Sequence, residues 1–201
     1  MAKKTILAVI IIFILSAFFI NITINDSVNL FIDGENVSVK TTTLNPNVDT
    51  SRLNSAICKY TVNAMNDSSS NITTLKDGIR DICIEYGFKN PKINVDSSIG
   101  KDQIPVIVYV SGTSMLPTLQ DGQSVLINKS NDIHVGDIVV ANSDEYGSII
   151  KRVGDINGNE VYLISDNKNV SYTYKNGIPY ETKGITTWVD ISNIIGVVIG
   201  Y

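Results

Sequence analysis

The sequence predicts a mainly β protein, in which a β domain follows a small helical region and one N-terminal transmembrane helix. Three observations carry this prediction. Residues 5–24 form a long apolar segment without a charged side chain. Two stretches between residues 50 and 87 repeat apolar residues with the 3.6-residue period of a helix. From residue 103 onward, short apolar runs alternate with Gly, Asn and Asp, which is typical of a β domain.

The apolar segment at residues 5–24 is long enough to cross a bilayer. At about 1.5 Å of rise per residue, it spans a hydrocarbon core of roughly 30 Å. Lys3 and Lys4 precede it, and Asp26 is the first charge after it. The positive-inside rule therefore places residues 1–4 in the cytoplasm and everything after residue 25 outside the cytoplasmic membrane. We expect a single-pass protein with an extracytoplasmic body.

A cleaved signal peptide is the alternative interpretation of this segment. Residues 18–21, Phe-Phe-Ile-Asn, lack the small-x-small pattern that precedes a signal-peptide cleavage site.

The net charge of -4 leaves no basic surface to neutralise phosphates, which argues against nucleic acid as a partner. The length of 201 residues allows one medium domain, or a small domain with an appendage.

The region 25–103 is predicted to contain a strand or hairpin and then two helices. Residues 27–43 alternate loosely between apolar and polar side chains, as an exposed strand or hairpin does. The helices are expected over about 50–65 and 72–87, joined by a turn at 66–71. They form a helical hairpin, and a polar linker near 97–102 follows.

The two cysteines of the chain fall on these two helices. Cys58 lies near the middle of the first helix and Cys83 late in the second, so antiparallel packing brings them roughly level. In an oxidising compartment they are candidates for a disulfide that would stabilise a small helical hairpin. Two reduced cysteines in the core are the alternative.

The region 104–201 is predicted to be the β domain. Its strands are expected where apolar runs stand between turn residues, at 104–110, 124–127, 137–141, 148–153, 160–164 and 194–199.

Ser114 lies in a tight turn directly after the first of these runs. Gly112 precedes it by two residues and Pro117 follows by three. Such a turn exposes the serine Oγ and leaves backbone N–H groups free to stabilise an oxyanion. A serine is a poor nucleophile on its own and needs a base within hydrogen-bond reach.

Lys151 is the better candidate for that base. Strand alternation places it on one face with Ile149 and Val153, and burial among apolar side chains lowers a lysine pKa until the neutral amine is available. An ordinary basic pair with Arg152 on an exposed strand is the alternative. His134, the single histidine, stands in a polar stretch, and we interpret it as a surface residue.

Several segments resemble the conserved boxes of type I signal peptidases, in the same order. The similar segments are Ser114–Leu119, Gly136–Val140, Lys151–Val153, Ser165–Asn167 with Ser171, and Ile195–Val197. The resemblance covers about residues 104–200. It implies the signal-peptidase-like β fold, and Lys151 makes the site similar to the bacterial-type serine/lysine dyad.

The resemblance implies a serine endopeptidase that needs no metal and no cofactor. Ser114 would attack the scissile carbonyl, and its backbone N–H would help to hold the oxyanion. Lys151 would take the serine proton and later protonate the leaving amine. Ser171 would orient the lysine amine. Substrates in this family carry small residues before the cleaved bond, which implies shallow apolar pockets.

The resemblance also implies a supporting or substrate-binding set. Met115 would line the substrate pocket, and Asp166 would support the site through Arg152. The remaining members of this set are Pro117, Asp137 and Asn167.

The chain departs from the family pattern in its last box and in its length before the nucleophile. Ser165 stands where glycine is usual, and Tyr172–Tyr174 replace the usual downstream residues. Gly112 replaces a hydroxyl residue that some members add to the oxyanion hole. Residues 25–103 separate the anchor from the β domain, where bacterial relatives have a short connection. This region could lift the site off the membrane, cap it, or bind a partner protein at residues 50–87.

We therefore expect exported precursor proteins as substrates, contacted near their signal peptides, and the lipid bilayer as a partner of residues 5–24. A dedicated processing protease for one surface substrate is an alternative. A non-catalytic, pilin-like anchored surface protein is another. Relatives that cleave themselves to inactivate a repressor are a poorer fit, because no DNA-binding helices precede the β domain.

Overall fold

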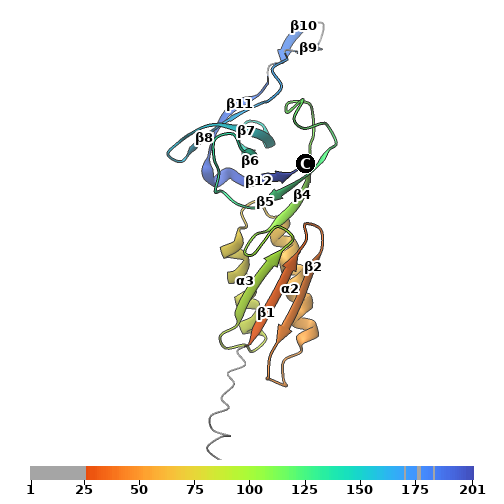
Figure 1. Cartoon of the computed structure of the whole chain (residues 1–201), viewed down its shortest axis with the longest axis vertical. Coiled ribbons are helices and arrows are strands. Elements are labelled where there is room, and N and C mark those ends of the chain that lie inside the picture. The colour runs from red at the N-terminus through yellow and green to blue at the C-terminus, as the bar shows by residue number, and fades with distance from the viewer. Residues whose placement is uncertain (1–25, 170, 176–177, 183) are drawn as a thin grey trace, which may run out of the picture.

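The chain folds into two units that are stacked along its long axis (Figure 1). The computed structural model describes residues 26–169, 171–175, 178–182 and 184–201, without the side chains of segment 170–183. We call residues 26–97 the accessory unit and residues 104–201 the curled-sheet domain.

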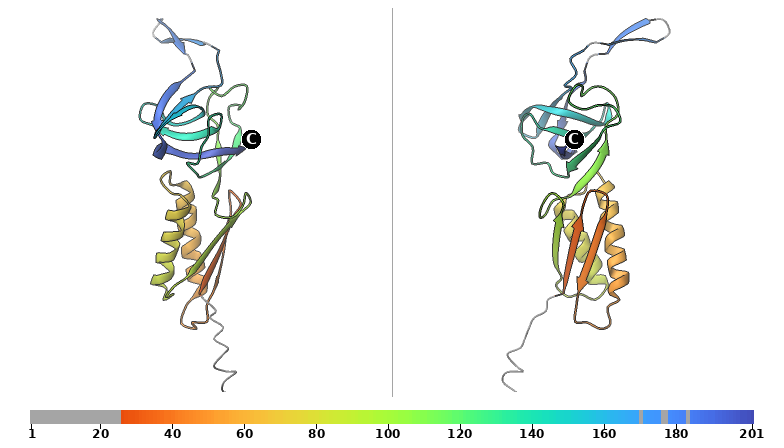
Figure 2. Two further views of the ribbon diagram at one scale, coloured as in Figure 1. Left: turned by 60° about the vertical axis from the view of Figure 1, so that its left-hand side comes forward. Right: turned by 45° about the vertical axis from the view of Figure 1, so that its right-hand side comes forward.

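The accessory unit is a three-stranded sheet with two helices on one face (Figure 2). Its elements are β1 (Ser27–Ile32), β2 (Val37–Thr42), α2 (Thr50–Asn66), α3 (Ile72–Glu85) and β3 (Lys92–Ser97). The strand order is β2-β1-β3. β1 pairs antiparallel with β2 and parallel with β3. The predicted hairpin and both predicted helices are present, but β3 was not predicted.

Alternation in β1 explains how this unit forms its core. Val28, Leu30 and Ile32 are buried on the side of the helices, where Leu53 and Ile57 of α2 meet them. Apolar side chains from two layers thus leave water together, which is the main source of stability for such a fold. The helices are not an isolated hairpin, as the sequence had suggested, but one layer of a two-layer unit.

The disulfide predicted between Cys58 and Cys83 is absent, and both are free thiols. Cys58 lies on the side of α2 that faces β2, and its Sγ is 3.8 Å from the Val37 carbonyl oxygen. Cys83 is fully buried in the core. Burial raises the pKa of the Cys83 thiol to about 11, with a smaller effect from Asp26. The helices pack against the sheet, and this shared core takes the stabilising role that was predicted for the disulfide.

The curled-sheet domain contains a seven-stranded sheet in the order β11-β8-β7-β6-β12-β5-β4. All six neighbouring pairs in this sheet are antiparallel. The strands are β4 (Pro105–Tyr109), β5 (Ser124–Asn128), β6 (Ile138–Ser143), β7 (Gly147–Asn157), β8 (Glu160–Ile164), β11 (Thr186–Asp190) and β12 (Ile194–Gly200). A short 3-10 helix, η1 (Ile191–Asn193), precedes β12.

A separate two-stranded hairpin projects from the end of this domain that is remote from the accessory unit (Figures 1 and 2). Its strands are β9 (Ser171–Lys175) and β10 (Ile178–Thr182), which pair antiparallel. Neither these two strands nor β11 was predicted from the sequence.

Lys129, directly after β5, joins the two units. Its side chain is buried, and its Nζ donates to the carbonyl oxygens of Ala64 at 3.0 Å, Met65 at 3.4 Å and Asp67. These carbonyls belong to the last turn of α2 and the residue that follows it. A helix C-terminus leaves its last carbonyls without partners inside the helix and carries partial negative charge, so a lysine there satisfies both needs.

Within the residues that the structure describes, no helix is both long and apolar enough to cross a membrane. The predicted anchor at residues 5–24 lies outside the described residues.

Candidate active site

The turn that carries Ser114 follows β4 and is shaped by local hydrogen bonds. Gly112 has φ of +89°, a conformation that side chains with a Cβ rarely adopt. Its N–H donates to the Asp121 carboxylate at 2.8 Å, and the Leu119 N–H donates to the Met115 carbonyl at 2.9 Å. The glycine is therefore required by the backbone of the turn.

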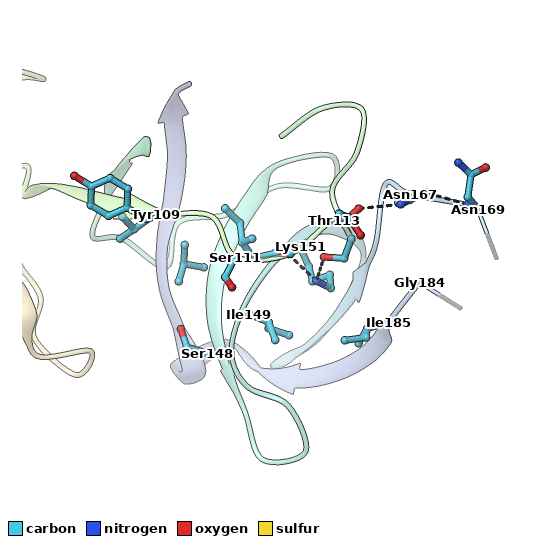
Figure 3. A pocket seen from close by; sticks show the side chains of 15 residues that line it. Tyr109, Ser111, Thr113, Ser148, Ile149, Lys151, Asn167, Asn169, Gly184 and Ile185 are labelled. Atoms are coloured by element: carbon cyan, nitrogen blue, oxygen red, sulfur yellow. Dashed lines mark hydrogen bonds between the residues drawn. The ribbon is translucent and has the colours of Figure 1, made fainter. Parts of the chain in front are cut away.

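Lys151 lies on β7 and reaches Ser114 directly. The Lys151 Nζ is 2.7 Å from Ser114 Oγ and also donates to the Ile150 carbonyl oxygen at 2.9 Å (Figure 3). Lys151 has 3% of its surface exposed, and Ile149 and Val153 on the same strand face are buried as well. Strand alternation thus brings the lysine to the serine across 37 residues of sequence.

Burial shapes the acid–base behaviour of this lysine. Desolvation lowers the pKa of Lys151 below its ordinary value of 10.5. Among the described residues, no carboxylate forms an ion pair with it that would oppose this effect. A buried, unpaired amine that touches a hydroxyl is the arrangement expected of a general base.

Arg152 and Asp166 tie the lysine strand to the turn. The Arg152 guanidinium makes two bonds to the carboxylate, from Nε at 2.8 Å and from Nη2 at 2.6 Å. Thr118 Oγ1, in the serine turn, donates to the same carboxylate at 2.6 Å. The Arg152 hydrogen bond is the main reason why the pKa of Asp166 lies below its ordinary value, and Thr118 adds to it.

Asn167 holds the backbone on either side of the nucleophile. Its N–H donates to the Ser114 carbonyl oxygen, and its Nδ2 donates to the Thr113 carbonyl oxygen, both at 2.9 Å. The sequence placed Asn167 in a supporting set, but its contact with the serine turn was not predicted. The chain distance of more than 50 residues leaves no local signal for this contact.

The Ser114 N–H is available to a substrate. In the part of the chain that the structure describes, this donor has no hydrogen-bond acceptor. An oxyanion hole needs a donor of this kind beside the nucleophile.

An open pocket of about 440 Å³ adjoins Ser114 and Lys151. Apolar side chains form part of its wall, and the Asn167–Asn169 and Gly184–Ile185 segments close one side (Figure 3). The apolar lining residues are Val108, Val140, Ile149, Ile150 and Ile185. Such a wall suits small apolar groups.

Three of the predicted site residues lie elsewhere. Met115 is fully buried in a core cluster with Leu119 and Val125, so the prediction that it lines the pocket is wrong. Asp137 stands before β6 and accepts a bond from the His134 N–H at 2.8 Å. Pro117 follows a cis peptide bond within the turn.

The remaining predictions concern Ser171 and His134. Ser171 begins β9, but its side chain is outside the described set, so its predicted contact with the lysine amine stays a prediction. The side chain of His134 is 78% exposed, with its Nδ1 3.7 Å from Asp137 Oδ2, as the surface interpretation of this histidine expects. No group of three or more His, Cys, Asp or Glu residues suited to a metal occurs among the described residues.

The sequence matches the family model described as Peptidase S24-like over residues 78–183, just over half of the chain. The match begins inside α3 and extends past β10, so it contains both Ser114 and Lys151. No match is found among curated proteins. The narrower resemblance to type I signal peptidases goes beyond this match. At the level of the family, the chain belongs to the S24-like peptidases and is a serine peptidase.

Proposed function

We propose that the protein is a membrane-anchored serine endopeptidase that cleaves exported precursors near their signal peptides, with Ser114 as nucleophile and Lys151 as general base. One observation carries the proposal: a buried lysine amine lies 2.7 Å from the serine hydroxyl oxygen. The order of the sequence segments that resemble signal peptidases supports the choice of substrate. The apolar segment at residues 5–24 supports the anchor.

The reaction follows from the positions of these groups. The neutral Lys151 amine takes the Ser114 proton as Oγ bonds to the scissile carbonyl carbon. The carbonyl oxygen becomes an oxyanion, which the Ser114 N–H stabilises. The C–N bond then breaks, and the Lys151 ammonium returns the proton to the leaving amine. Water, deprotonated by Lys151, hydrolyses the acyl-serine and regenerates both groups.

The free edge of β4 supports an extended polypeptide as the substrate. β4 is the last strand of the sheet, and within the described part of the chain it pairs with β5 alone. The Val110 N–H donates to the Gln123 carbonyl oxygen on that side, at 2.8 Å. Alternation then turns the backbone groups of Tyr109 and Ser111 to the open side, beside the pocket. A polypeptide can add there as a further strand.

The experiment reconstitutes the full chain in lipid vesicles with an exported precursor and detects the products by mass spectrometry. Wild type cleaves at one bond, whereas Ser114→Ala and Lys151→Ala abolish cleavage. Ser51→Ala and Lys101→Ala are the matched controls and keep activity, since both residues are exposed and neither lines the pocket or contacts the dyad. Full activity of either dyad variant would disprove the mechanism.

A dedicated processing protease is the second candidate, and the accessory unit favours it because that unit precedes the peptidase domain as a folded body of its own. A panel of unrelated exported precursors separates the two: a general signal peptidase cleaves many of them, and a dedicated enzyme cleaves one. An acylating serine probe adds a further check. If Ser114 takes up no label in a folded sample and no precursor is cleaved, the chain is a non-catalytic surface protein.

A further inference from the structure

The path of the chain separates the N-terminal end of the accessory unit from the peptidase domain. β1 starts at Ser27, three residues after the predicted anchor, and runs towards the peptidase domain. β3 is parallel to β1 and continues through residues 98–104 into β4. The end at which residue 26 enters is therefore opposite to the end that carries the peptidase domain. We call it the base.

The length of the accessory unit along its long axis determines how far the pocket lies from the base. Helix α2 runs along it for 17 residues, which corresponds to roughly 25 Å. The pocket lies further away still, because its lining begins at Val108 near the far end of β4 and includes Gly184, next to the projecting hairpin.

The junction between the units is built to be rigid. The Lys129 ammonium, buried at the C-terminus of α2, bonds three carbonyls of the accessory unit. Lys76 of α3 pairs with Asp102 of the connection at 2.6 Å. Ile104, at the entrance to β4, is 1% exposed and packs in the core of the accessory unit. A connection of this kind does not act as a flexible hinge.

We propose that the accessory unit is a rigid spacer, so the substrates are polypeptides whose scissile bond lies at least about 25 Å outside the membrane surface. This inference rests on the proposed anchor and endopeptidase activity. The pocket lining also argues that the accessory unit is a spacer and not a cap over the active site. All residues that line the pocket come from the segment 108–185, so the accessory unit does not cover the site.

The spacing defines which bonds are accessible. An extended chain covers about 3.3 Å per residue, so a membrane-tethered substrate needs roughly eight residues between its own span and the cleaved bond. Bonds at the membrane surface are out of reach. This narrows the proposed function: the junction of a signal peptide that is still inserted in the bilayer is out of reach, and exported precursors whose cleaved bond stands off the membrane, or has left it, are the substrate class.

The decisive measurement is the height of the pocket above a bilayer. Two variants of the full chain are prepared, one with a clickable amino acid in place of Tyr109 at the pocket rim and one with it in place of Leu44 at the base. Each variant is labelled with one donor dye. These sites are a matched pair, since Tyr109 is 73% exposed and Leu44 is 68% exposed. The vesicles contain acceptor-labelled lipid. We expect strong energy transfer from the Leu44 dye and weak transfer from the Tyr109 dye.

Equal transfer from the two sites overturns the inference, and so does a chain that fails to associate with vesicles. The Ser114→Ala background gives the same heights if the inference is right. Failure of the spacer is thereby distinguished from failure of the catalytic mechanism, which the cleavage assay tests on its own.

A reporter series then measures reach by cleavage. Single-span reporters carry the cleaved precursor segment about 2, 8 or 16 residues from the membrane. We expect cleavage of the two longer reporters and at least a tenfold loss for the shortest. A flexible insert of about 20 residues between Asn25 and Asp26 restores cleavage of the shortest reporter, because the domain can then approach the surface. Equal cleavage of all three reporters by the unmodified chain contradicts the spacer.

Discussion

Arg152, the residue after Lys151, forms an ion pair with Asp166 through two hydrogen bonds, with N–O distances of 2.8 and 2.6 Å. Alternation along β7 sends the arginine to the opposite strand face from the lysine. The pair fixes the strand to the segment after β8, and Thr118 attaches the serine turn to the same carboxylate. The distance between Ser114 Oγ and Lys151 Nζ thus depends on Arg152 and Asp166, which do not line the pocket.

Asp166→Asn should lower the free energy of unfolding by about 2 kcal/mol at neutral pH, because it removes the charge from a bidentate pair. The pKa of this carboxyl is below its ordinary value of 3.8 in the folded state. Its stabilisation is therefore complete above 3.8 and is lost as the pH falls through the lower folded value. Urea unfolding at about pH 7 and about pH 3 measures this.

The exposed carboxylate of Asp132 provides the control for this prediction. Asp132→Asn should leave stability unchanged at both pH values. A difference between wild type and Asp166→Asn that is as large at about pH 3 as at about pH 7 would show that the carboxylate charge is not the cause.

The rate of peptide cleavage should rise with pH as Lys151 loses its proton. Desolvation lowers the pKa of this amine, so the rise in kcat/KM is centred below 10.5. Below that centre, the logarithm of kcat/KM gains about one unit per pH unit, since a single deprotonation is required. Lys129→Met should keep the same profile, although the pKa of Lys129 is also lowered by burial. A profile centred at or above 10.5 contradicts a desolvated base.

Asn167→Ala should reduce kcat about tenfold to a hundredfold with little change in KM, because small displacements of a nucleophile are costly. The side-chain bond to the Thr113 carbonyl oxygen is lost. Asn167→Asp should act similarly, since a carboxylate cannot donate to that carbonyl. Asn131→Ala, in an exposed loop that does not line the pocket, is the control. A rise in KM at constant kcat would instead make Asn167 a substrate contact.

Lys129→Met should destabilise the protein by about 1 to 3 kcal/mol, because three carbonyls, two of them on the buried residues Ala64 and Met65, lose their donor while the apolar stem is kept. We also expect the two units to unfold in separate steps, which calorimetry resolves. Lys101→Met, on the exposed connection, should have no effect. A single unchanged transition in Lys129→Met would mean that other contacts hold the units together.

Cys58 and Cys83 should behave as two thiols of different reactivity. Cys58 is partly exposed and should react with a thiol reagent in the folded protein, whereas Cys83 is buried and has a raised pKa of about 11. Cys83 should react only after unfolding. A reducing agent should leave Tm unchanged. A crosslinked peptide in a non-reducing digest would refute this.

Periodicity predicted those elements whose burial pattern is a local property. The alternation of Ile149, Lys151 and Val153 correctly indicated a lysine on a buried strand face. The helical spacing of Leu53 and Ile57 identified α2 in the same way. In both cases one face of a single element meets the core, and this is visible in a short window of sequence.

Contacts between distant segments had no such signal. β3 has a mixed pattern of exposure, and its parallel pairing with β1 joins residues about 65 positions apart. The resemblance to signal peptidases implied that Met115 lines the pocket, yet Met115 lies in a buried cluster with side chains from β5 and β6. The bond from Asn167 to the turn is equally remote. These features depend on the assembled sheet.

The reliance of the serine turn on Asn167 has a consequence for biosynthesis. The carbonyls on both sides of the nucleophile are held by a residue made more than 50 positions later. A nascent chain that has exposed Ser114 but not yet Asn167 lacks the support that shapes the turn. The site is therefore completed only when the segment that carries Asn167 has been made, so cleavage activity is acquired late in synthesis.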